Sequence, residues 1–320
     1  MPFADVDVRE ILAAFDLGPR GRLSAGPVDS GRLGSIWRLE TNSASWAVKD
    51  VTEADDHELI EILDGAAFQE AALAAGVPTP GVRRTRMGEV IAAVGAVRVR
   101  VHEWVDVHPP ALDLDPTDLG RLIAALHRVD FAGTVGTHPW YEAPVGEARW
   151  REIIESLRAG RAPFAVELEA LVPELVALEA YLGNQPRDLR TCHRDLWADN
   201  LRRTLHGGLC VFDFDNAGLA DPSQELALVL VEFGGVDVSR ARAIKTAYAQ
   251  AGGPGRVEGP RDFAMVIAQL AHIVEEGCRR WLGATSDEAR ADNEAWVREF
   301  IDRPLTRRVV ETLVATCRVD

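Results

Sequence analysis

One segment, residues 189–216, constrains the fold of this chain more than any other. It is β-like and rich in loop residues, and it contains His-Arg-Asp-Leu at positions 193–196. Asn200 follows, and thirteen positions later an apolar run ends at Asp213. Carboxylate and amide oxygens are the ligands that Mg2+ prefers, together with phosphate and water. We therefore expect Asp195, Asn200 and Asp213 to meet around one divalent ion and a phosphate group.

Composition and charge define the broad class of protein. The 320 residues are about twice the roughly 150 of a typical domain, and 47% apolar with 27% charged residues is typical of globular chains. The 35 Lys and Arg against 50 Asp and Glu leave a net charge of -15, which repels nucleic acid backbones and anionic membranes. We expect neither as a partner, whereas a small cationic molecule would be attracted.

The cysteines and the apolar stretches indicate the compartment. The four cysteines lie far apart and form no CxxC pair, which predicts reduced, structural thiols. They are Cys192, Cys210, Cys278 and Cys317. The first residues are acidic where a signal peptide has a basic end. The apolar stretches 90–97 and 226–231 are much shorter than the roughly 18 residues of a membrane span. We therefore expect a cytoplasmic protein.

The first hundred residues have the pattern of strands around one helix. Short apolar runs broken by Gly, Ser and Asn predict three strands within 22–51, with a glycine-bearing turn at 30–35 between the first two. Residues 55–75 are rich in Ala, Leu, Glu and Gln, and a glycine and two prolines within 76–80 end this predicted helix. Two further strands are predicted within 90–101.

Two consecutive prolines mark the change to the second half. His108-Pro109-Pro110 stops helices and sheet ladders. Beyond it, apolar residues recur with helical spacing within 119–126, 168–182 and 263–281. The fold class is therefore predicted to be α+β, in two domains. These are a nucleotide-binding lobe with a small antiparallel sheet and one helix, residues 1–106, and a larger, mainly helical lobe with the substrate pocket, residues 107–320.

Positions 193–200 satisfy the H-R-D-L-x-x-x-N signature of the catalytic loop of kinases. Phosphoryl transfer requires alignment of the acceptor hydroxyl and neutralisation of charge on the transferring group. In such a site Asp195 accepts the proton of the hydroxyl. Asn200 and Asp213 hold the Mg2+ ion.

The predicted strands supply the other contacts to a nucleotide. Lys49, on the third predicted strand, would place a positive charge on the α- and β-phosphates of ATP. Backbone N–H groups near Gly31 and Gly34, with Ser35 beside them, would cover the triphosphate. The predicted cofactors are therefore ATP and Mg2+.

The chain resembles the aminoglycoside phosphotransferase family, the small-molecule branch of the protein-kinase-like fold. Besides the catalytic loop, the segments that carry the resemblance are Ala47–Lys49, Gly76–Pro80, Val101–Asp106, Leu126-His127, Asp221-Pro222 and Glu225–Ala227. The resemblance implies a two-lobed fold with ATP between the lobes. It also implies that adenine binds the backbone of Glu103, Trp104 and Val105.

The resemblance further implies a partner for the strand lysine. Members of the family usually pair this lysine with a glutamate on the following helix. Glu58, Glu61 and Glu70 all compete for that position here. The distance along the chain from Lys49 favours Glu70.

The segment after Asp213 distinguishes between classes of acceptor. Only seven residues separate Asp213 from Asp221, so there is no room for a long activation loop with a phosphorylation site. The predicted function is phosphorylation of a hydroxyl on a small molecule, with an aminoglycoside or similar cationic natural product first. The alternatives are a metabolic kinase for a sugar, amino alcohol or homoserine-like substrate, and a nucleotide-binding protein without turnover. The acceptor, its hydroxyl, ATP against GTP, and the oligomeric state are not defined by the sequence.

Several side chains near these motifs have either a structural or a functional interpretation. His193 is expected to brace the loop rather than act as a base, and Arg194 is either a surface cation or a functional one. Asp215 is either a second metal ligand or a carboxylate that braces its loop. Asp221 is expected to cap a helix. The acidic residues of the C-terminal helices are expected to form a solvated face rather than a dock for a polyamine.

Overall fold

The computed structural model describes residues 6–31, 34–183 and 188–318. Its internal contacts divide the chain into two compact units. The first comprises residues 1–111, 128–135 and 198–218, and the second comprises 112–127, 136–197 and 219–320. The first unit thus ends close to the predicted boundary at 106, but it also takes in two later segments that the prediction assigned to the helical lobe.

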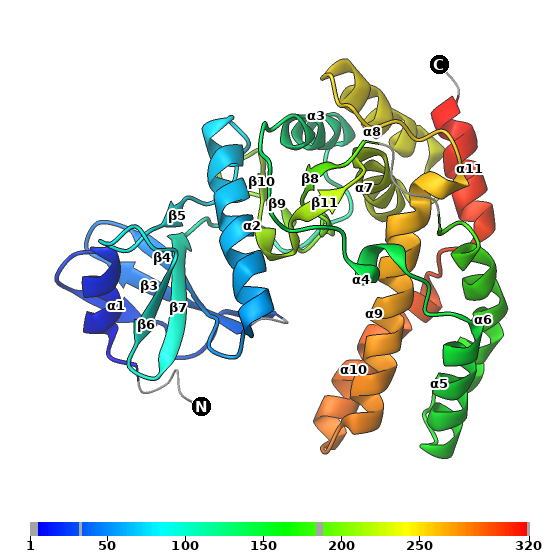
Figure 1. The fold of residues 1–320 in the computed structure, drawn as a ribbon, viewed down its shortest axis with the longest axis horizontal. Coiled ribbons are helices and arrows are strands. Elements are labelled where there is room, and N and C mark those ends of the chain that lie inside the picture. The colour runs from blue at the N-terminus through cyan, green and yellow to red at the C-terminus, as the bar shows by residue number, and fades with distance from the viewer. Residues whose placement is uncertain (1–5, 32–33, 184–187, 319–320) are drawn as a thin grey trace. The chain divides into compact units, whose positions relative to one another are not determined.

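The first unit is built on one antiparallel sheet. Its strands are β1 (Gly21–Leu23), β2 (Asp29–Gly31), β3 (Gly34–Thr41), β4 (Ser45–Asp50), β5 (Val82–Arg83), β6 (Ile91–Val94) and β7 (Val97–Glu103). The order is β1-β3-β4-β7-β5, with β2 also paired to β3 and β6 to β7. Strands β3 to β7 are labelled in Figure 1. The predicted antiparallel sheet is therefore present.

Alternation along β4 and β7 decides which side chains face the core. Val48, Val99 and Val101 are fully buried and pack in one cluster with helix α1 (Val8–Phe15). Because successive residues of a strand point to opposite faces, Lys49 and Arg100 lie on the other face. They are directly opposite each other in the β4–β7 register.

Helix α2 (Asp56–Ala74) contacts the segment that follows Asp213. It begins with a capping box between Asp55 and Glu58. A hairpin of β9 (Leu201–Arg203) and β10 (Leu209–Val211) leads into the short 3-10 helix η2 (Phe214–Asn216). At Gly65 of α2 the backbone of Phe214 approaches so closely that an added Cβ would lie 2.2 Å from its carbonyl oxygen.

The second unit is mainly helical. Its helices are α3 (Pro116–His127), α4 (Pro139–Glu142), α5 (Glu147–Ala159), α6 (Ala165–Glu179), α7 (Pro222–Val229), η3 (Leu230–Gly234), α8 (Val238–Gln250), η4 (Pro260–Phe263), α9 (Ala264–Gly283), α10 (Asp287–Asp302) and α11 (Arg307–Arg318). Two short strands, β8 (Arg190–Cys192) and β11 (Gly218–Ala220), pair with each other.

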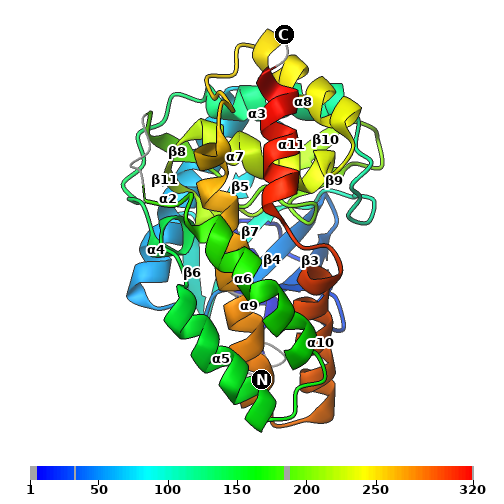
Figure 2. The same cartoon turned by 90° about the vertical axis from the view of Figure 1, so that its right-hand side faces the viewer.

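Helix α9 is the centre of the helical packing. It contacts α4, α5, α6, α7 and α10, and the α9–α10 and α5–α6 pairs are visible in Figure 2. Trp150, Phe164, Cys278 and Trp281 belong to its core cluster. All four cysteines of the chain are free and buried, as predicted. No helix within the described residues combines the length and the hydropathy that a membrane crossing needs.

The α+β class is confirmed, but the N-terminal elements differ from the prediction. Helix α1 was not predicted, although Asp7 caps it and Ile11, Leu12 and Phe15 form its buried side. Four strands precede α2 instead of three, because β2 is the polar tripeptide Asp-Ser-Gly and gives no apolar signal. The two-residue strand β5 was also missed, since strands this short have no readable alternation.

Candidate active site

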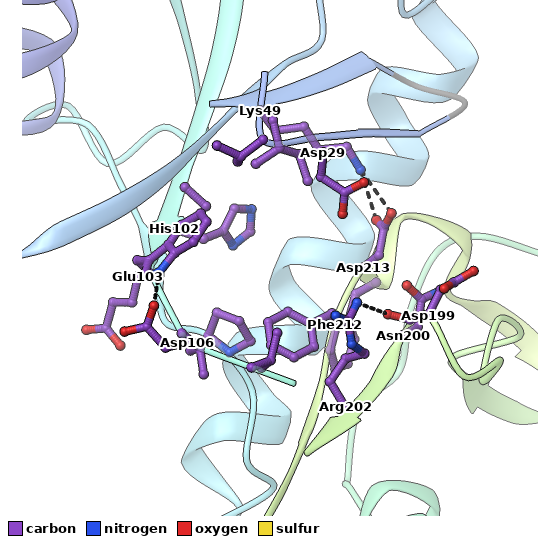
Figure 3. Close-up of a pocket in the computed structure, with 18 of the residues that line it drawn as sticks. Asp29, Lys49, His102, Glu103, Asp106, Asp199, Asn200, Arg202, Phe212 and Asp213 are labelled. Atoms are coloured by element: carbon purple, nitrogen blue, oxygen red, sulfur yellow. Dashed lines mark hydrogen bonds and ion pairs between the residues drawn. The ribbon is translucent and has the colours of Figure 1, made fainter. Parts of the chain in front are cut away.

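A cavity of about 350 Å³ lies in the first unit. It is lined by side chains of β4 and β7, by the segment after β7, and by the β9–β10 hairpin and its flanks (Figure 3). Six residues predicted for the site lie in this lining. They are Lys49, Glu103, Trp104, Val105, Asn200 and Asp213.

The hairpin of β2 and β3, which contains the predicted glycine-bearing turn, contributes side chains to the cavity. Val28, Asp29 and Ile36 line the cavity, whereas Gly34 and Ser35 are not among the described lining residues. The prediction for Gly31 lies outside the residues whose surroundings the structure describes. The two residues at the tip of this turn, 32 and 33, lie outside the described part of the chain. Gly34 has a structural role, because its φ is +136° and an added Cβ would lie 1.9 Å from the carbonyl oxygen of Asp50. The contact of this hairpin with a triphosphate stays a prediction.

Lys49 is the centre of a buried group of charges. Its Nζ atom lies 3.0 and 3.1 Å from the two carboxylate oxygens of Asp213 and 2.7 Å from Asp215 Oδ2. Arg100 Nη2 donates to the same Asp215 oxygen at 2.6 Å. Burial raises the pKa of Asp215, but the charges of Arg100 and Lys49 outweigh burial and hold this pKa below its ordinary value. Two cations and two carboxylates thus balance each other.

The prediction that Glu70 pairs with Lys49 is wrong for this structure. Glu70 accepts from Arg84 at 2.7 and 2.6 Å, and Glu58 closes the capping box of α2. Glu61 lies 3.9 Å from His57. The buried face of α2 is made of Ile62, Gly65, Ala66, Phe68, Gln69 and Ala72. In this structure Lys49 pairs with Asp213 and Asp215 instead.

Asp213 and Asn200 offer a donor set that fits Mg2+. A carboxylate and an amide are hard oxygen ligands, and Figure 3 shows both residues at the same side of the cavity. The Asp213 side chain is 35% exposed, whereas that of Asp215 is 2% exposed. Asp213 also has a φ of +53°, a conformation that non-glycine residues adopt rarely and that clusters at functional sites.

The segment after β7 uses some of its backbone groups internally. The N–H of Glu103 donates to Gly81 O at 2.8 Å, and the N–H of Trp104 donates to Ser45 O at 3.1 Å. Within the part of the chain that the structure describes, the N–H of Val105 has no such acceptor. Val105 lines the cavity.

His102 and Arg100 line the cavity but were not predicted to be site residues. The His102 ring points into the cavity in Figure 3. Burial, followed by the charge of Arg100, lowers the pKa of His102 to about 3, so the imidazole is neutral at pH 7. The sequence signal for both was the alternation Val-Arg-Val-Arg-Val-His over 97–102, which places every second side chain on the face of Lys49.

The second unit holds the loop that ends at Asp195. His193 and Arg194 are buried, and their backbone N–H groups donate to the Glu225 carboxylate. His127 donates from Nε2 to the same carboxylate at 2.8 Å, and its Nδ1 accepts from the Tyr248 hydroxyl at 2.7 Å. His193 is therefore interior, as predicted.

Arg194 is a buried residue and not a surface cation. Its guanidinium lies 4.4 Å from the ring centroid of Tyr141 and donates to Gly136 O at 3.0 Å. Gln269 donates to the Arg194 carbonyl at 2.7 Å. With Asp221 capping α7 as expected, the backbone before Asp195 is held at several points of the second unit.

A sheet with a buried lysine beside a carboxylate, joined to a helical unit that carries a His-Arg-Asp loop, is the architecture of kinases that phosphorylate small molecules. Residues 24–260 match the family model described as APH, phosphotransferase enzyme family. The chain belongs to this family. Compared by sequence with curated proteins, the chain matches none of them.

Solved structures share the fold. A spectinomycin phosphotransferase in complex with ADP and spectinomycin aligns with a TM-score of 0.63 and 13% identity over 92% of each chain. A microcompartment-associated aminopropanol kinase aligns with a TM-score of 0.61 and 15% identity over 98% of each chain. An aminoglycoside phosphotransferase from Alicyclobacillus acidocaldarius aligns with a TM-score of 0.55 and 18% identity over 92% of each chain. At these identities the likeness establishes the shared fold.

Proposed function

We propose that the chain transfers the γ-phosphoryl group of ATP, with Mg2+, to a hydroxyl of a small molecule. The observation that carries this proposal is the group of Lys49, Asp213 and Asn200 around the cavity of the first unit. Family membership supports the class of reaction.

Each residue has a separate task in this proposal. Lys49 attracts the α- and β-phosphates, and the N–H of Val105 donates to the base. Asn200 and Asp213 would hold Mg2+, which would neutralise negative charge on the phosphates of the nucleotide. Asp195 accepts the proton of the acceptor hydroxyl and orients its oxygen toward the γ-phosphorus.

The acceptor is proposed to be a small cation with a hydroxyl group, first an aminoglycoside or a similar natural product. The net charge of -15 supports a cationic ligand in general. The acidic C-terminal helices give little further support, because many of their carboxylates pair with arginines. These pairs are Glu275 with Arg149, Glu276 with Arg279 and Arg280, and Glu294 with Arg298.

The second candidate is a metabolic kinase for an amino alcohol. The observation that favours it is the alignment with the aminopropanol kinase, which covers 98% of both chains. An amino alcohol also combines a positive charge with a hydroxyl, so the two candidates share their chemistry and differ in size.

The test is ADP formation by the purified chain with magnesium-ATP and a panel of aminoglycosides, sugars and amino alcohols. The proposal predicts turnover with at least one cationic hydroxyl compound and none with a deoxy analogue that lacks the accepting hydroxyl. Tight magnesium-ATP binding without turnover on the panel would favour a nucleotide-binding protein. Absence of ATP binding would contradict the proposal as a whole.

A further inference from the structure

We propose that Arg100 and Asp215 form a fixed ion pair that orients Lys49 toward the phosphates of the nucleotide. This inference rests on the proposed function, and it names two residues that take the place of the expected helix glutamate. It is carried by four observations in the first unit: strand register, burial, hydrogen bonding and the contact of α2 with the 214–215 backbone.

Strand register places two cations side by side. Lys49 on β4 and Arg100 on β7 are direct cross-strand partners. They are 5% and 3% exposed. Like charges directly opposite each other destabilise a sheet, and buried charges must be paired. The sheet therefore needs a carboxylate between the two cations.

Asp215 is that carboxylate. Its Oδ2 accepts from Lys49 Nζ at 2.7 Å and from Arg100 Nη2 at 2.6 Å, while its Oδ1 lies 2.5 Å from the same Arg100 nitrogen. Asp215 is 2% exposed, so its carboxylate is shielded from solvent. Asp213 lies farther from Arg100, at 3.7 Å, and its side chain is 35% exposed. Asp215 is thus the fixed partner of Lys49, and Asp213 is the partner that can turn to a metal ion.

The contact of α2 with the 214–215 backbone leaves no room for a carboxylate side chain at position 65 of the helix. A Cβ added at Gly65 would lie 2.2 Å from the Phe214 carbonyl oxygen and 3.6 Å from Asp215 Cα. Any side chain at position 65 would therefore collide with this backbone. A glutamate at this point of α2 has no space. The backbone of residues 214–215 occupies that space and brings its own carboxylate to Lys49.

The net charge of the buried group depends on the partner of Asp213. With Asp213 paired to Lys49, two cations balance two carboxylates. When Asp213 serves the metal ion, Lys49 and Arg100 face Asp215 alone, which leaves one positive charge at the cavity wall for the phosphates. The adenosine part of the nucleotide does not depend on this charge.

The test compares ligands with and without phosphates. Magnesium-ATP is titrated by calorimetry, and adenosine by ligand-observed NMR, into wild type, Arg100→Met, Asp215→Asn and the double variant Arg100→Met/Asp215→Asn. The double variant removes one cation and one carboxylate, so the buried charges stay balanced if Asp215→Asn alone does not fold. Arg84→Gln is the matched control, because it breaks an arginine–carboxylate pair of the same unit that does not touch Lys49.

We expect the Kd for magnesium-ATP to rise about tenfold or more in Arg100→Met and in the double variant, with the Kd for adenosine unchanged. Arg100→Lys should restore part of the loss, because it keeps the charge but not the planar group. Arg84→Gln should bind both ligands as wild type does. Unchanged magnesium-ATP binding in the variants, or an equal loss for adenosine, would overturn the inference. Wild type that binds no magnesium-ATP would instead contradict the proposed function.

Discussion

Asp195 lies at the end of a loop that the second unit fixes through its backbone. Two consecutive N–H groups donate to Glu225, and the next carbonyl oxygen accepts from Gln269. Because Glu225 and Gln269 are buried, these contacts do not exchange with water. The sequence identified Asp195 itself through a local motif, but it could not identify Glu225 as the anchor, since the two lie on separate elements.

Replacing Asp195 by Ala is expected to lower kcat by about 10²- to 10⁴-fold, the usual contribution of a positioned base. The affinity for magnesium-ATP should stay close to that of wild type, because the predicted task of Asp195 concerns the acceptor hydroxyl. Steady-state kinetics and nucleotide titration check both parts. Asp188→Ala is the control, since this exposed carboxylate pairs with Arg190 on the surface. A variant at 195 that keeps more than about a tenth of kcat contradicts the role.

His102 is expected to make the free energy of unfolding depend on pH. Its pKa is about 3 in the folded chain because of burial and the charge of Arg100, against about 6.5 in an unfolded chain. The unfolded state therefore binds more protons between these values, so the free energy of unfolding should fall as pH drops below about 6.5. His102→Leu should make this fall less steep in denaturant titrations between pH 8 and 5. Equal slopes in both proteins would rule out a lowered pKa of His102.

At the scale of elements, the relation between α2 and the sheet decides which carboxylate meets Lys49. The helix itself was predictable from composition and from the residues that end it. The side of α2 that faces the sheet was not predictable. It depends on Gly65, which allows the backbone of residues 214–215 to approach the helix. Glu70 was chosen by distance along the chain, but it pairs with Arg84. Arg100, by contrast, was visible in the alternation of β7 and could have been predicted as a neighbour of Lys49.

Gly65→Ala should separate α2 from η2. The added Cβ would lie 2.2 Å from the Phe214 carbonyl oxygen, so the backbone must shift. We expect a loss of about 1–3 kcal/mol in the free energy of unfolding, as for other overpacked sites, and weaker magnesium-ATP binding. Gly283→Ala is the control, because this helical glycine has open space around its Cβ position. Equal stability of Gly65→Ala and wild type in chemical denaturation would show that this contact is not tight.

At the scale of the whole molecule, the order of elements along the chain was largely predictable and the membership of the two units was not. The Pro109-Pro110 boundary falls close to the end of the first unit at residue 111. Residues 198–218 return to that unit because their backbone bonds to it, as in the donation from Val211 N–H to Pro78 O at 2.9 Å. Such long-range pairing has no local sequence signal, so a motif that is continuous in sequence is divided between two units.

Lys49 and Asp213 are proposed to bind magnesium-ATP in the cavity of the first unit. Calorimetric titration of ATP into wild type and Asp213→Asn, with magnesium and with a chelator, tests this proposal most directly. Magnesium is expected to strengthen ATP binding to wild type, and Asp213→Asn is expected to lose this dependence on magnesium. Wild type that binds no ATP, or an Asp213→Asn variant that keeps the full magnesium dependence, would contradict it.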